Sequence, residues 1–524
     1  MDEKKLYSFI FYITLFGLCF VLANHTAGYD FDLWARLIVG KVFWATGHVL
    51  KHDFLSYTPT HIWYDHEWGS GTFCFYPVQI LFGPIGLVVL QAIFIFLTFV
   101  LCIKTIKLRM GEKYSHHILL ILLTLLVYNR CVALPVRCQM FSFLFVALVL
   151  YLLERARDGK DKTLWIIPFL TIIWNNLHGG VVSGLGIVFM YAVGEFLCRR
   201  PFKKYLIVLA CSLPLLVINP HGIKYLDFLF MANTMARQDI LEWWGVLHPF
   251  HIKNCIPFFV WSGFVFVVEL FVLLKDLWVK KFAGFFKELN YTKWILLLVT
   301  FYLGFIHIKL IPIFMITAFS FCYEDFYKIV PKSDISKVLS LIFVFILIAG
   351  IGIFSPTTAK ATWVMYPLKE VEFIKSNGIK GNIITSYGHG SYVTYKLFPH
   401  NKVYMDGRYE EVYDEEILMH LKVFLEAGYA WGNILERYPA DVILLEKNAP
   451  VYKYLEESFP EWKKVYEGEL CGVFVKNAKP VSEYKLPPEG IDYYKETMFD
   501  TDMTQEFLKE FIPKFMKSEA YYAK

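Results

Sequence analysis

The chain has 524 residues, of which 56% are hydrophobic and only 19% are charged, and its formal net charge is +5. A soluble globular protein of this length carries more charge, so the composition excludes an ordinary soluble enzyme. The basic residues lie mainly in short segments between apolar runs, a topological pattern that gives no indication of a nucleic-acid partner. The ten cysteines are scattered without a CxxC pair, which indicates neither a disulfide framework nor a zinc site.

Apolar runs recur through the first two thirds of the chain, each close to the roughly 20 residues that a membrane helix needs. The first run follows MDEKK without a small-residue cleavage site, and it predicts a retained signal anchor. Hydropathy predicts a polytopic membrane protein with about eleven transmembrane helices. The expected spans are 6–24, 83–104, 116–133, 139–154, 163–178, 181–198, 204–219, 254–274, 292–306, 308–323 and 336–355.

The dense Lys and Arg clusters all fall on one side if the N-terminus is cytoplasmic, as the positive-inside rule requires. We therefore expect an integral protein of the inner or plasma membrane. Its outer face receives the loop 25–71, the turns near 129–138 and 175–180, the loop 219–254, and everything after residue 355.

The outer loop 25–71 holds Asp30 and Asp32 just after the first span. Carboxylates so close to a membrane are costly and are usually kept for a function. One can take a proton from an incoming hydroxyl, while the other helps to hold a divalent cation or orients the acceptor. Either aspartate is also a good N-cap for the helix expected at 33–47, which has the apolar spacing of a helix lying in the membrane interface.

His66 and Glu67 precede the second span. The pair can ligate a metal or serve as a further acid or base. Equally, it can be a solvated anchor, with Trp63 and Trp68 marking the headgroup depth. The histidines of this loop do not have the HExxH spacing, so a protein-only zinc site is not expected.

Two further outer segments carry polar groups. Arg137 opens the fourth span, where it can clamp a phosphate with two hydrogen bonds, snorkel, or pair with a loop carboxylate. Asn176 and His178 precede Gly179-Gly180, and glycines let the backbone approach a ligand closely. His178 can donate to a phosphate or a sugar hydroxyl, but the segment also reads as a tight turn between two helices.

His221 lies in Asn219-Pro220-His221-Gly222 at the end of the seventh span, and Glu242 precedes Trp243-Trp244 in the loop that follows. A carboxylate beside paired tryptophans suits sugar binding, although an interfacial aromatic belt explains the same residues. His307 and Lys309, between two later spans, offer outward cations for a phosphate.

After residue 358 the composition changes to that of a small α/β domain, expected at 359–480, which is followed by a charged tail at 481–524 with a helix near 505–516. Strands alternate with helices, which favours a mostly parallel sheet ending in an edge hairpin. The expected strands are 382–385, 402–405, 441–445, 462–467 and 471–475. The expected helices are 370–376, 390–397, 415–427, 431–438 and 449–456.

Two loops of this domain follow strands, at 386–391 and 405–408. The carboxyl ends of strands and the N-termini of helices are places where α/β domains bind ligands and anions. A structural pair between Asp406 and Arg408 explains the second loop equally well. With residues 1–358 as the membrane domain, the chain is thus expected to have three parts.

These segments resemble the GT-C class of integral-membrane glycosyltransferases. The chain is similar to bacterial GT-C-like membrane proteins of unassigned substrate, near the protein mannosyltransferase and aminoarabinose transferase group. The resemblance covers roughly residues 5–475. The motifs that carry it are Tyr29–Trp34, Asp53–Thr58, His66–Trp68, Arg137–Ser142, Asn176–Gly180, Asn219–Gly222, Tyr387–Tyr392 and Met405–Arg408.

The resemblance implies a polyprenyl-phosphate or polyprenyl-diphosphate sugar donor and an acidic catalytic base in the first outer loop, here Asp30 or Asp32. Some members use a divalent cation such as Mg²⁺ or Mn²⁺ and others use none, so a metal at Asp30 and Asp32 stays open. Gly245 follows Trp243-Trp244, so the WWD signature of oligosaccharyltransferases is missing and protein N-glycosylation is not supported.

We therefore expect an inverting glycosyl transfer to a glycan, lipid or protein acceptor on the extracytoplasmic face. Asp30 or Asp32 takes the acceptor proton, and Glu67 is a third catalytic candidate. The substrate-binding candidates are His66, Arg137, Asn176, His178, His221, Glu242, His307 and Lys309. The alternative is a non-catalytic lipid- or glycan-binding component of cell-envelope assembly. A transporter is disfavoured because the polar residues gather on one face and not at mid-membrane.

Overall fold

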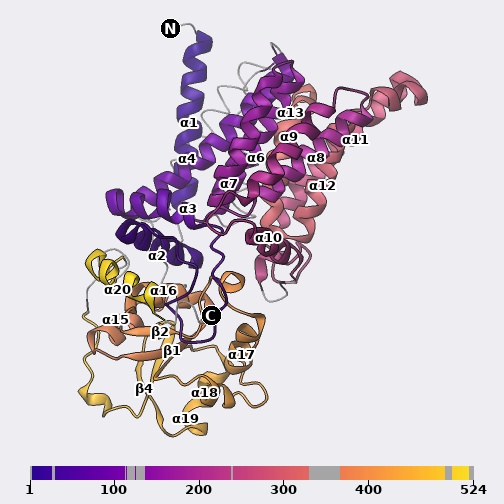
Figure 1. Ribbon diagram of the computed structural model, residues 1–524. Helices are drawn as coiled ribbons and strands as arrows, with labels where there is room; N and C mark the ends of the chain where they lie inside the picture. The colour runs from indigo at the N-terminus through magenta and orange to yellow at the C-terminus, as the bar shows by residue number, and fades with distance from the viewer. Residues whose placement is uncertain are drawn as a thin grey trace. The chain divides into compact units, whose positions relative to one another are not determined.

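The computed structural model describes residues 3–25, 30–111, 114, 124–125, 136–235, 237, 240–329, 366–489 and 499–518. The chain divides into two units. Unit 1 comprises residues 1–27 and 84–359, and unit 2 comprises residues 28–83 and 360–524. Residues 28–83, which sequence analysis grouped with the membrane domain, therefore pack with the C-terminal part of the chain (Figure 1).

Unit 1 is built from helices. They are α1 (Glu3–His25), the part of α4 (Tyr76–Met110) that follows Gly83, α6 (Gln139–Arg157), α7 (Ile166–Leu177), α8 (Val181–Leu197), α9 (Lys203–Ser212), α10 (Lys224–Thr234), α11 (Ile256–Glu288), α12 (Tyr291–Ile306) and α13 (Ile311–Ile329). Short 3-10 turns connect them: η3 (Asp161–Trp165), η4 (Leu213–Val217), η5 (Leu241–Trp243) and η6 (Ile308–Leu310).

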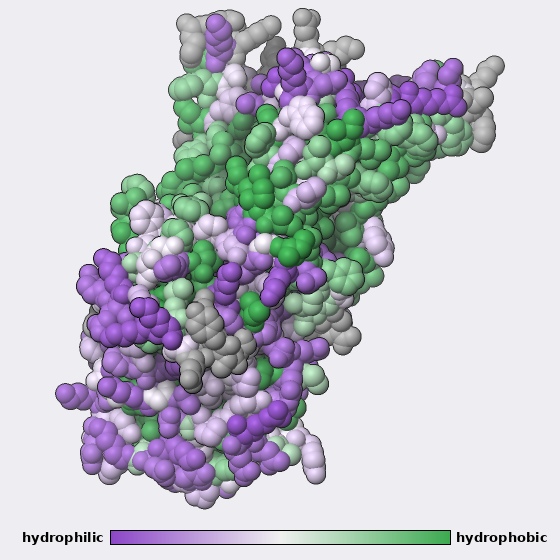
Figure 2. All heavy atoms as spheres, in the orientation of Figure 1, coloured by the Kyte–Doolittle hydropathy of each residue, from purple (hydrophilic) through white to green (hydrophobic). Residues whose placement is uncertain are grey.

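Among the residues that the structure describes, five helical stretches are long and apolar enough to cross a membrane: Lys5–Asn24, Trp68–Met110, Gln139–Arg157, Ile256–Val279 and Ile308–Lys328. Two shorter apolar helices are α8 and α12. Hydrophobic side chains cover much of the surface of the unit 1 helices in Figure 2, as expected for an integral membrane protein.

The predicted number of eleven spans is not established. Helices α7 and α9 have 12 and 10 residues, and an α-helix rises only about 1.5 Å per residue, so neither alone crosses a hydrocarbon layer of about 30 Å. The predicted span 336–355 lies outside the described residues, and so does nearly all of 116–133.

Charged side chains inside unit 1 are paired across helices. The Arg157 guanidinium binds Glu154 at 2.9 Å and also contacts Glu195 on α8. The Lys293 ammonium at the start of α12 binds Asp325 on α13 at 2.8 Å. A charge away from water is tolerated only with such partners, so these pairs join the helices to which they belong.

Unit 2 contains a five-stranded sheet in the order β2-β1-β3-β5-β4. The strands are β1 (Gly381–Thr385), β2 (Asn401–Val403), β3 (Val442–Glu446), β4 (Trp462–Glu467) and β5 (Cys471–Lys476). Strands β2, β1 and β3 are parallel, whereas β5 and β4 form an antiparallel hairpin at one edge. The five predicted strands and the edge hairpin are confirmed, whereas the sheet is mixed and not mostly parallel, because β3 pairs with β5 in the antiparallel sense.

Helices pack around this sheet. They are α2 (Phe31–Thr46), α3 (Trp68–Ser70), the π-helical turn η1 (Gly71–Phe75), α15 (Leu368–Ser376), α16 (Tyr387–Leu397), α17 (Glu415–Leu425), α18 (Asn433–Arg437), α19 (Leu455–Ser458) and α20 (Gln505–Lys517). Three 3-10 turns complete the unit: η7 (Tyr409–Glu411), η8 (Pro450–Lys453) and η9 (Val481–Glu483).

Helix α2 forms where sequence analysis expected it. Its apolar side packs against protein, however, so α2 is not the interfacial helix that was predicted. It packs against α16, α20 and η1. Trp34 is fully buried beside Tyr392 and Tyr395. A Cβ at Gly40 would lie 2.4 Å from the Gly71 carbonyl oxygen, so a glycine lets α2 and η1 touch. Aromatic packing from the C-terminal part thus takes the place of lipid.

The predicted tail helix exists as α20, and its packing can be tested. Ile512 is fully buried. Ile512→Ala should destabilise unit 2 by about 2–5 kcal/mol, because it removes buried methyl groups and leaves a cavity. The loss of stability is measured by thermal unfolding in detergent, with the protease sensitivity of residues 366–518 as the readout. Lys509→Ala on the exposed face of α20 is the control and should change little.

Candidate functional site

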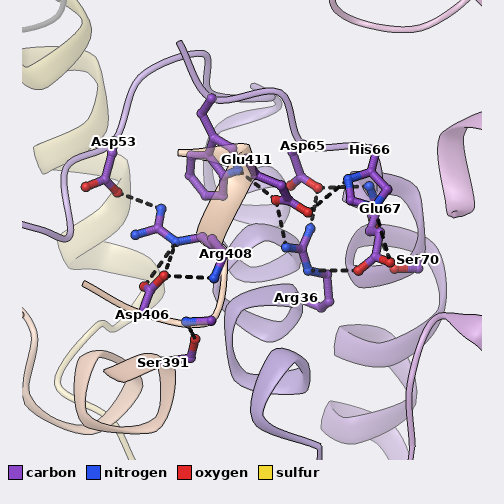
Figure 3. Close-up of polar contacts among 12 residues, drawn as sticks. Arg36, Asp53, Asp65, His66, Glu67, Ser70, Ser391, Asp406, Arg408 and Glu411 are labelled. Carbon is purple, nitrogen blue, oxygen red and sulfur yellow. Dashed lines mark hydrogen bonds and ion pairs between the residues drawn. The ribbon is translucent and has the colours of Figure 1, made fainter. Parts of the chain in front are cut away.

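Five charged residues of unit 2 converge around the guanidinium of Arg36 (Figure 3). This Arg36 cluster consists of Arg36, Asp65, His66, Glu67 and Glu411. Arg36 extends from α2 and is 2% exposed. Its Nη2 donates to Glu411 Oε2 at 2.9 Å, its Nη1 donates to Asp65 Oδ1, and its Nε lies 3.5 Å from Glu67 Oε2. The cluster joins the first loop to η7 of the C-terminal part.

His66 lies between two carboxylates. Its Nδ1 is 3.0 Å from Glu411 Oε1, and its Nε2 is 3.5 Å from Glu67 Oε1. Burial alone would lower the pKa of His66, but the charge of Glu411, its hydrogen bond and the charge of Glu67 raise that pKa to about 9. The imidazole is therefore protonated at neutral pH, with each ring nitrogen facing a carboxylate.

The Arg36 cluster holds one more negative group than positive ones, since Arg36 and His66 face three carboxylates. Burial raises the pKa of Asp65 to about 6 even though Arg36 opposes the shift. Burial also raises the pKa of Glu67. At Glu411 the charges of Arg36 and His66 outweigh the effect of burial, and the pKa falls to about 2. Asp65 and Glu67 therefore hold a proton more readily than Glu411 does.

Asp30 and Asp32 begin helix α2. Asp30 is the N-cap, and its Oδ1 accepts a hydrogen bond of 3.0 Å from the Asp32 backbone N–H. The Asp32 carboxylate lies against the turn after β2, where a Cβ at Gly407 would be 2.9 Å from Asp32 Oδ1. Asp30 therefore has the capping role that sequence analysis left open, and Asp32 faces a turn that only a glycine fits.

A second buried arginine, Arg408, pairs with carboxylates on both sides. Its Nη1 donates to Asp53 at 2.6 Å, and its Nε donates to Asp406 at 2.8 Å (Figure 3). Burial opposes ionisation of Asp53, but the charge of Arg408 and hydrogen bonds from Ser56 hold its pKa below the usual value. The side chains of Arg408, Asp53 and Asp406 are fully buried. The loop 405–408 therefore holds structural ion pairs and is not an open ligand site.

One group of metal-ligand residues stands out in the described part of the chain. Ligand atoms of His66, Glu67 and Glu411 lie within 4.8 Å of one another. The two nitrogens of His66 face different carboxylates, however, and one metal ion binds only one of them. That arrangement suits a shared proton better than a cation. A metal at Asp30 and Asp32 stays a prediction.

In unit 1, three cations gather around Trp243 and Glu242. The Arg137 guanidinium reaches both carboxylate oxygens of Glu242, at 2.5 and 3.5 Å. Lys309 Nζ lies 3.2 Å from the centre of the Trp243 ring, and Arg237 Cζ lies 4.4 Å from it. We call these five residues the Trp243 cluster. Burial opposes ionisation of Glu242, but Arg137, Lys309 and Arg237 lower its pKa.

Backbone hydrogen bonds fix the Trp243 cluster. Val246 N–H donates to the Phe305 carbonyl at 3.0 Å, and Ile308 N–H donates to the Trp244 carbonyl at 3.1 Å. His307 Nδ1 donates to the Trp243 carbonyl at 2.6 Å. A Cβ at Gly245 would lie 3.1 Å from Phe305 O. The departure from WWD thus falls at a close backbone approach that favours glycine.

His178 and Asn176 hold the turn between α7 and α8. Ser142 Oγ lies 2.6 Å from His178 Nδ1, which also accepts the Gly180 N–H at 3.0 Å. The ring proton therefore resides on Nε2. Asn176 Nδ2 donates to the carbonyls of Ile172 and Ile218. The polar turn is thus ordered by its own side chains.

His221 lies at the end of η4, apart from the Trp243 contacts described above. Its backbone N–H donates to Asn219 Oδ1 at 2.7 Å, and its ring stacks on Tyr225. The structure therefore brings together Arg137, Glu242, His307 and Lys309 among the predicted substrate-binding residues. It places Asn176 in the last turn of α7 and His178 and His221 in turns.

Comparison with solved structures gives a similarity in fold. No family model and no curated protein matches the sequence. The structure is similar to the archaeal oligosaccharyltransferase AglB from Archaeoglobus fulgidus, solved with an inhibitory peptide and a dolichol-phosphate. The TM-score is 0.51 over 85% of this chain and 70% of that chain, with 9% sequence identity. The fold is of the GT-C type. At this identity the similarity establishes the fold alone, and the narrower subgroup stays a prediction.

Four charged residues of these clusters were not among the predicted site residues: Arg36, Asp65, Arg237 and Glu411. A buried arginine inside an otherwise apolar helical pattern is the one signal that was present, because such a charge needs carboxylate partners.

The charge on His66 makes a prediction about pH. A pKa raised from about 6.5 to 9 stabilises the fold fully below pH 6.5, and this contribution is lost as the pH rises through 9. The loss is on the order of 3 kcal/mol. The midpoint temperature of thermal unfolding should decrease as the pH is raised from 6.5 to 9. The decrease should be smaller in His66→Gln. Equal slopes in both proteins would contradict a charged His66.

Proposed function

We propose that this protein is a membrane glycosyltransferase that moves a sugar from a polyprenyl-phosphate or polyprenyl-diphosphate donor to an extracytoplasmic acceptor. The Trp243 cluster carries this proposal. Three cations surround a single carboxylate there, so the cluster has an excess positive charge of two. Such a site attracts an anion, and a lipid-linked phosphate supplies one.

The donor phosphate is proposed to bind at Arg137 and Lys309. The guanidinium of Arg137 now meets both oxygens of Glu242, in the two-pronged geometry that it also offers to a phosphate. Glu242 would act as a stand-in for the phosphate while the site is empty of donor. The Trp243 ring beside Lys309 gives an aromatic face on which a sugar can stack.

Asp32 is proposed as the catalytic base. Asp30 is engaged as the N-cap of α2, whereas Asp32 lies in the first turn of that helix and is partly exposed. In the proposed step the acceptor oxygen attacks the anomeric carbon and loses its proton to the Asp32 carboxylate. The bond from the anomeric carbon to the phosphate oxygen breaks, and the configuration inverts.

The leaving phosphate needs charge stabilisation more than protonation. Its developing negative charge would be met by Arg137 and Lys309, which are held by contacts that exist before the reaction. The fold shared with a solved oligosaccharyltransferase supports this assignment of reaction class. The identity of sugar and acceptor follows from neither cluster.

Asp32→Asn should trap the donor. We expect native mass spectrometry of gently solubilised protein to show a polyprenyl-phosphate sugar enriched in Asp32→Asn over the wild type, because binding persists without the base. Asp414→Asn changes the N-cap aspartate of α17 and is the control. Bulk phospholipid alone in every sample would contradict the donor assignment and favour the non-catalytic lipid-binding alternative.

Arg137→Ala and Lys309→Ala should weaken donor binding. A charge-assisted hydrogen bond is worth about 1.5–3 kcal/mol, so each change should lower the affinity for a polyprenyl phosphate about 10- to 100-fold. Lys224→Ala removes an exposed cation outside the cluster and should leave affinity unchanged. Titration of purified protein with a short-chain polyprenyl phosphate measures both. Equal affinities for all variants would place the phosphate elsewhere.

A further inference from the structure

The apolar stretch Trp68–Met110 is too long to be a single straight span. Its 43 residues would extend about 65 Å as a helix, about twice the hydrocarbon thickness of a bilayer. The sequence has no charged residue between Glu67 and Lys104. Gly83 breaks the helix, with φ 62° and ψ −157°. Residues 84–110 can span alone at about 40 Å, which leaves residues 68–82 without a place in that span.

Residues 68–82 have two different faces. One face is closed within unit 2, because Gly71 and Tyr76 touch Gly40 on α2, and the Tyr76 hydroxyl accepts a hydrogen bond of 2.7 Å from Gln505. The other face is apolar and exposed. Phe73 is 58% exposed, Leu81 70% and Phe82 63%.

Trp44 extends this exposed face from the end of α2. Its Nε1 donates to the Thr72 carbonyl at 2.8 Å, which holds the indole next to Phe73. The ring remains 58% exposed. An indole with its N–H satisfied and its face open is typical of the boundary between headgroups and acyl chains. We call Trp44, Phe73, Ile80, Leu81 and Phe82 the Trp44 patch.

We propose that the Trp44 patch is a membrane-surface anchor of unit 2, with residues 68–82 lying in the plane of the lipid interface. Its occupant is lipid because the segment that carries Phe73 and residues 80–82 continues along the chain into a span, and because no charged residue lies between residues 67 and 104. The interfacial role that the sequence suggested for residues 33–47 thus falls to the neighbouring segment.

Photochemical labelling tests this anchor. Phe73 and Phe82 are each replaced by photoreactive benzoylphenylalanine, which preserves an aromatic side chain. The full chain is placed in nanodiscs of one synthetic phosphatidylcholine, irradiated, and analysed by mass spectrometry. We expect a mass increase of one lipid molecule, localised to the peptide that carries residue 73 or 82.

Two controls make the result decisive. Phe264, 45% exposed in the apolar stretch Ile256–Val279, should acquire lipid. Tyr454, 50% exposed on the α/β unit, should acquire none. Labelling at 73 and 82 that equals Tyr454 while Phe264 is labelled would overturn the proposal, and so would cross-links to protein at both positions. If the variant at residue 73 or 82 does not fold, benzoylphenylalanine at Leu81 takes its place.

Discussion

The buried guanidinium of Arg36 is the interaction on which unit 2 depends. It sits on α2 and binds Asp65 and Glu411, two residues that are far apart in sequence. A buried charge without partners is strongly destabilising, so the first loop and the turn η7 must both be in place before Arg36 is satisfied. Removing one partner would leave the others buried with unbalanced charge.

Arg408 joins the same two parts of unit 2, but the arginine and its carboxylate partner come from the opposite parts. The arginine comes from the C-terminal part, and Asp53 comes from the first loop. Together the two arginines fix residues 53–67 against residues 406–411. They also fix Asp32 and Glu67 in one body, since Gly407 touches Asp32 and Arg36 contacts Glu67. Asp32, the proposed base, therefore lies against a turn more than 300 positions later in the chain.

The cluster in unit 1 is held by different means. This Trp243 cluster rests on backbone hydrogen bonds between residues 244–246 and 305–308. Gly245 permits that close approach. The cations of this cluster lie beside the Trp243 ring. The ring and the Glu242 carboxylate together compensate for the water that these cations have lost. Phosphate recognition there would need a rearrangement of side chains but not of backbone.

The sequence by itself determined the membrane class, the β-strands of the α/β unit and the tail helix, because hydropathy and the period of apolar residues are local properties. It also offered an ion pair between Asp406 and Arg408 as one of two interpretations of their loop, since the two lie on one short turn. It could not reveal that Arg36 meets Glu411, that Asp32 faces Gly407, or that Arg137 meets Glu242. Those contacts join segments distant in sequence, and only tertiary packing decides which carboxylate each buried cation will find.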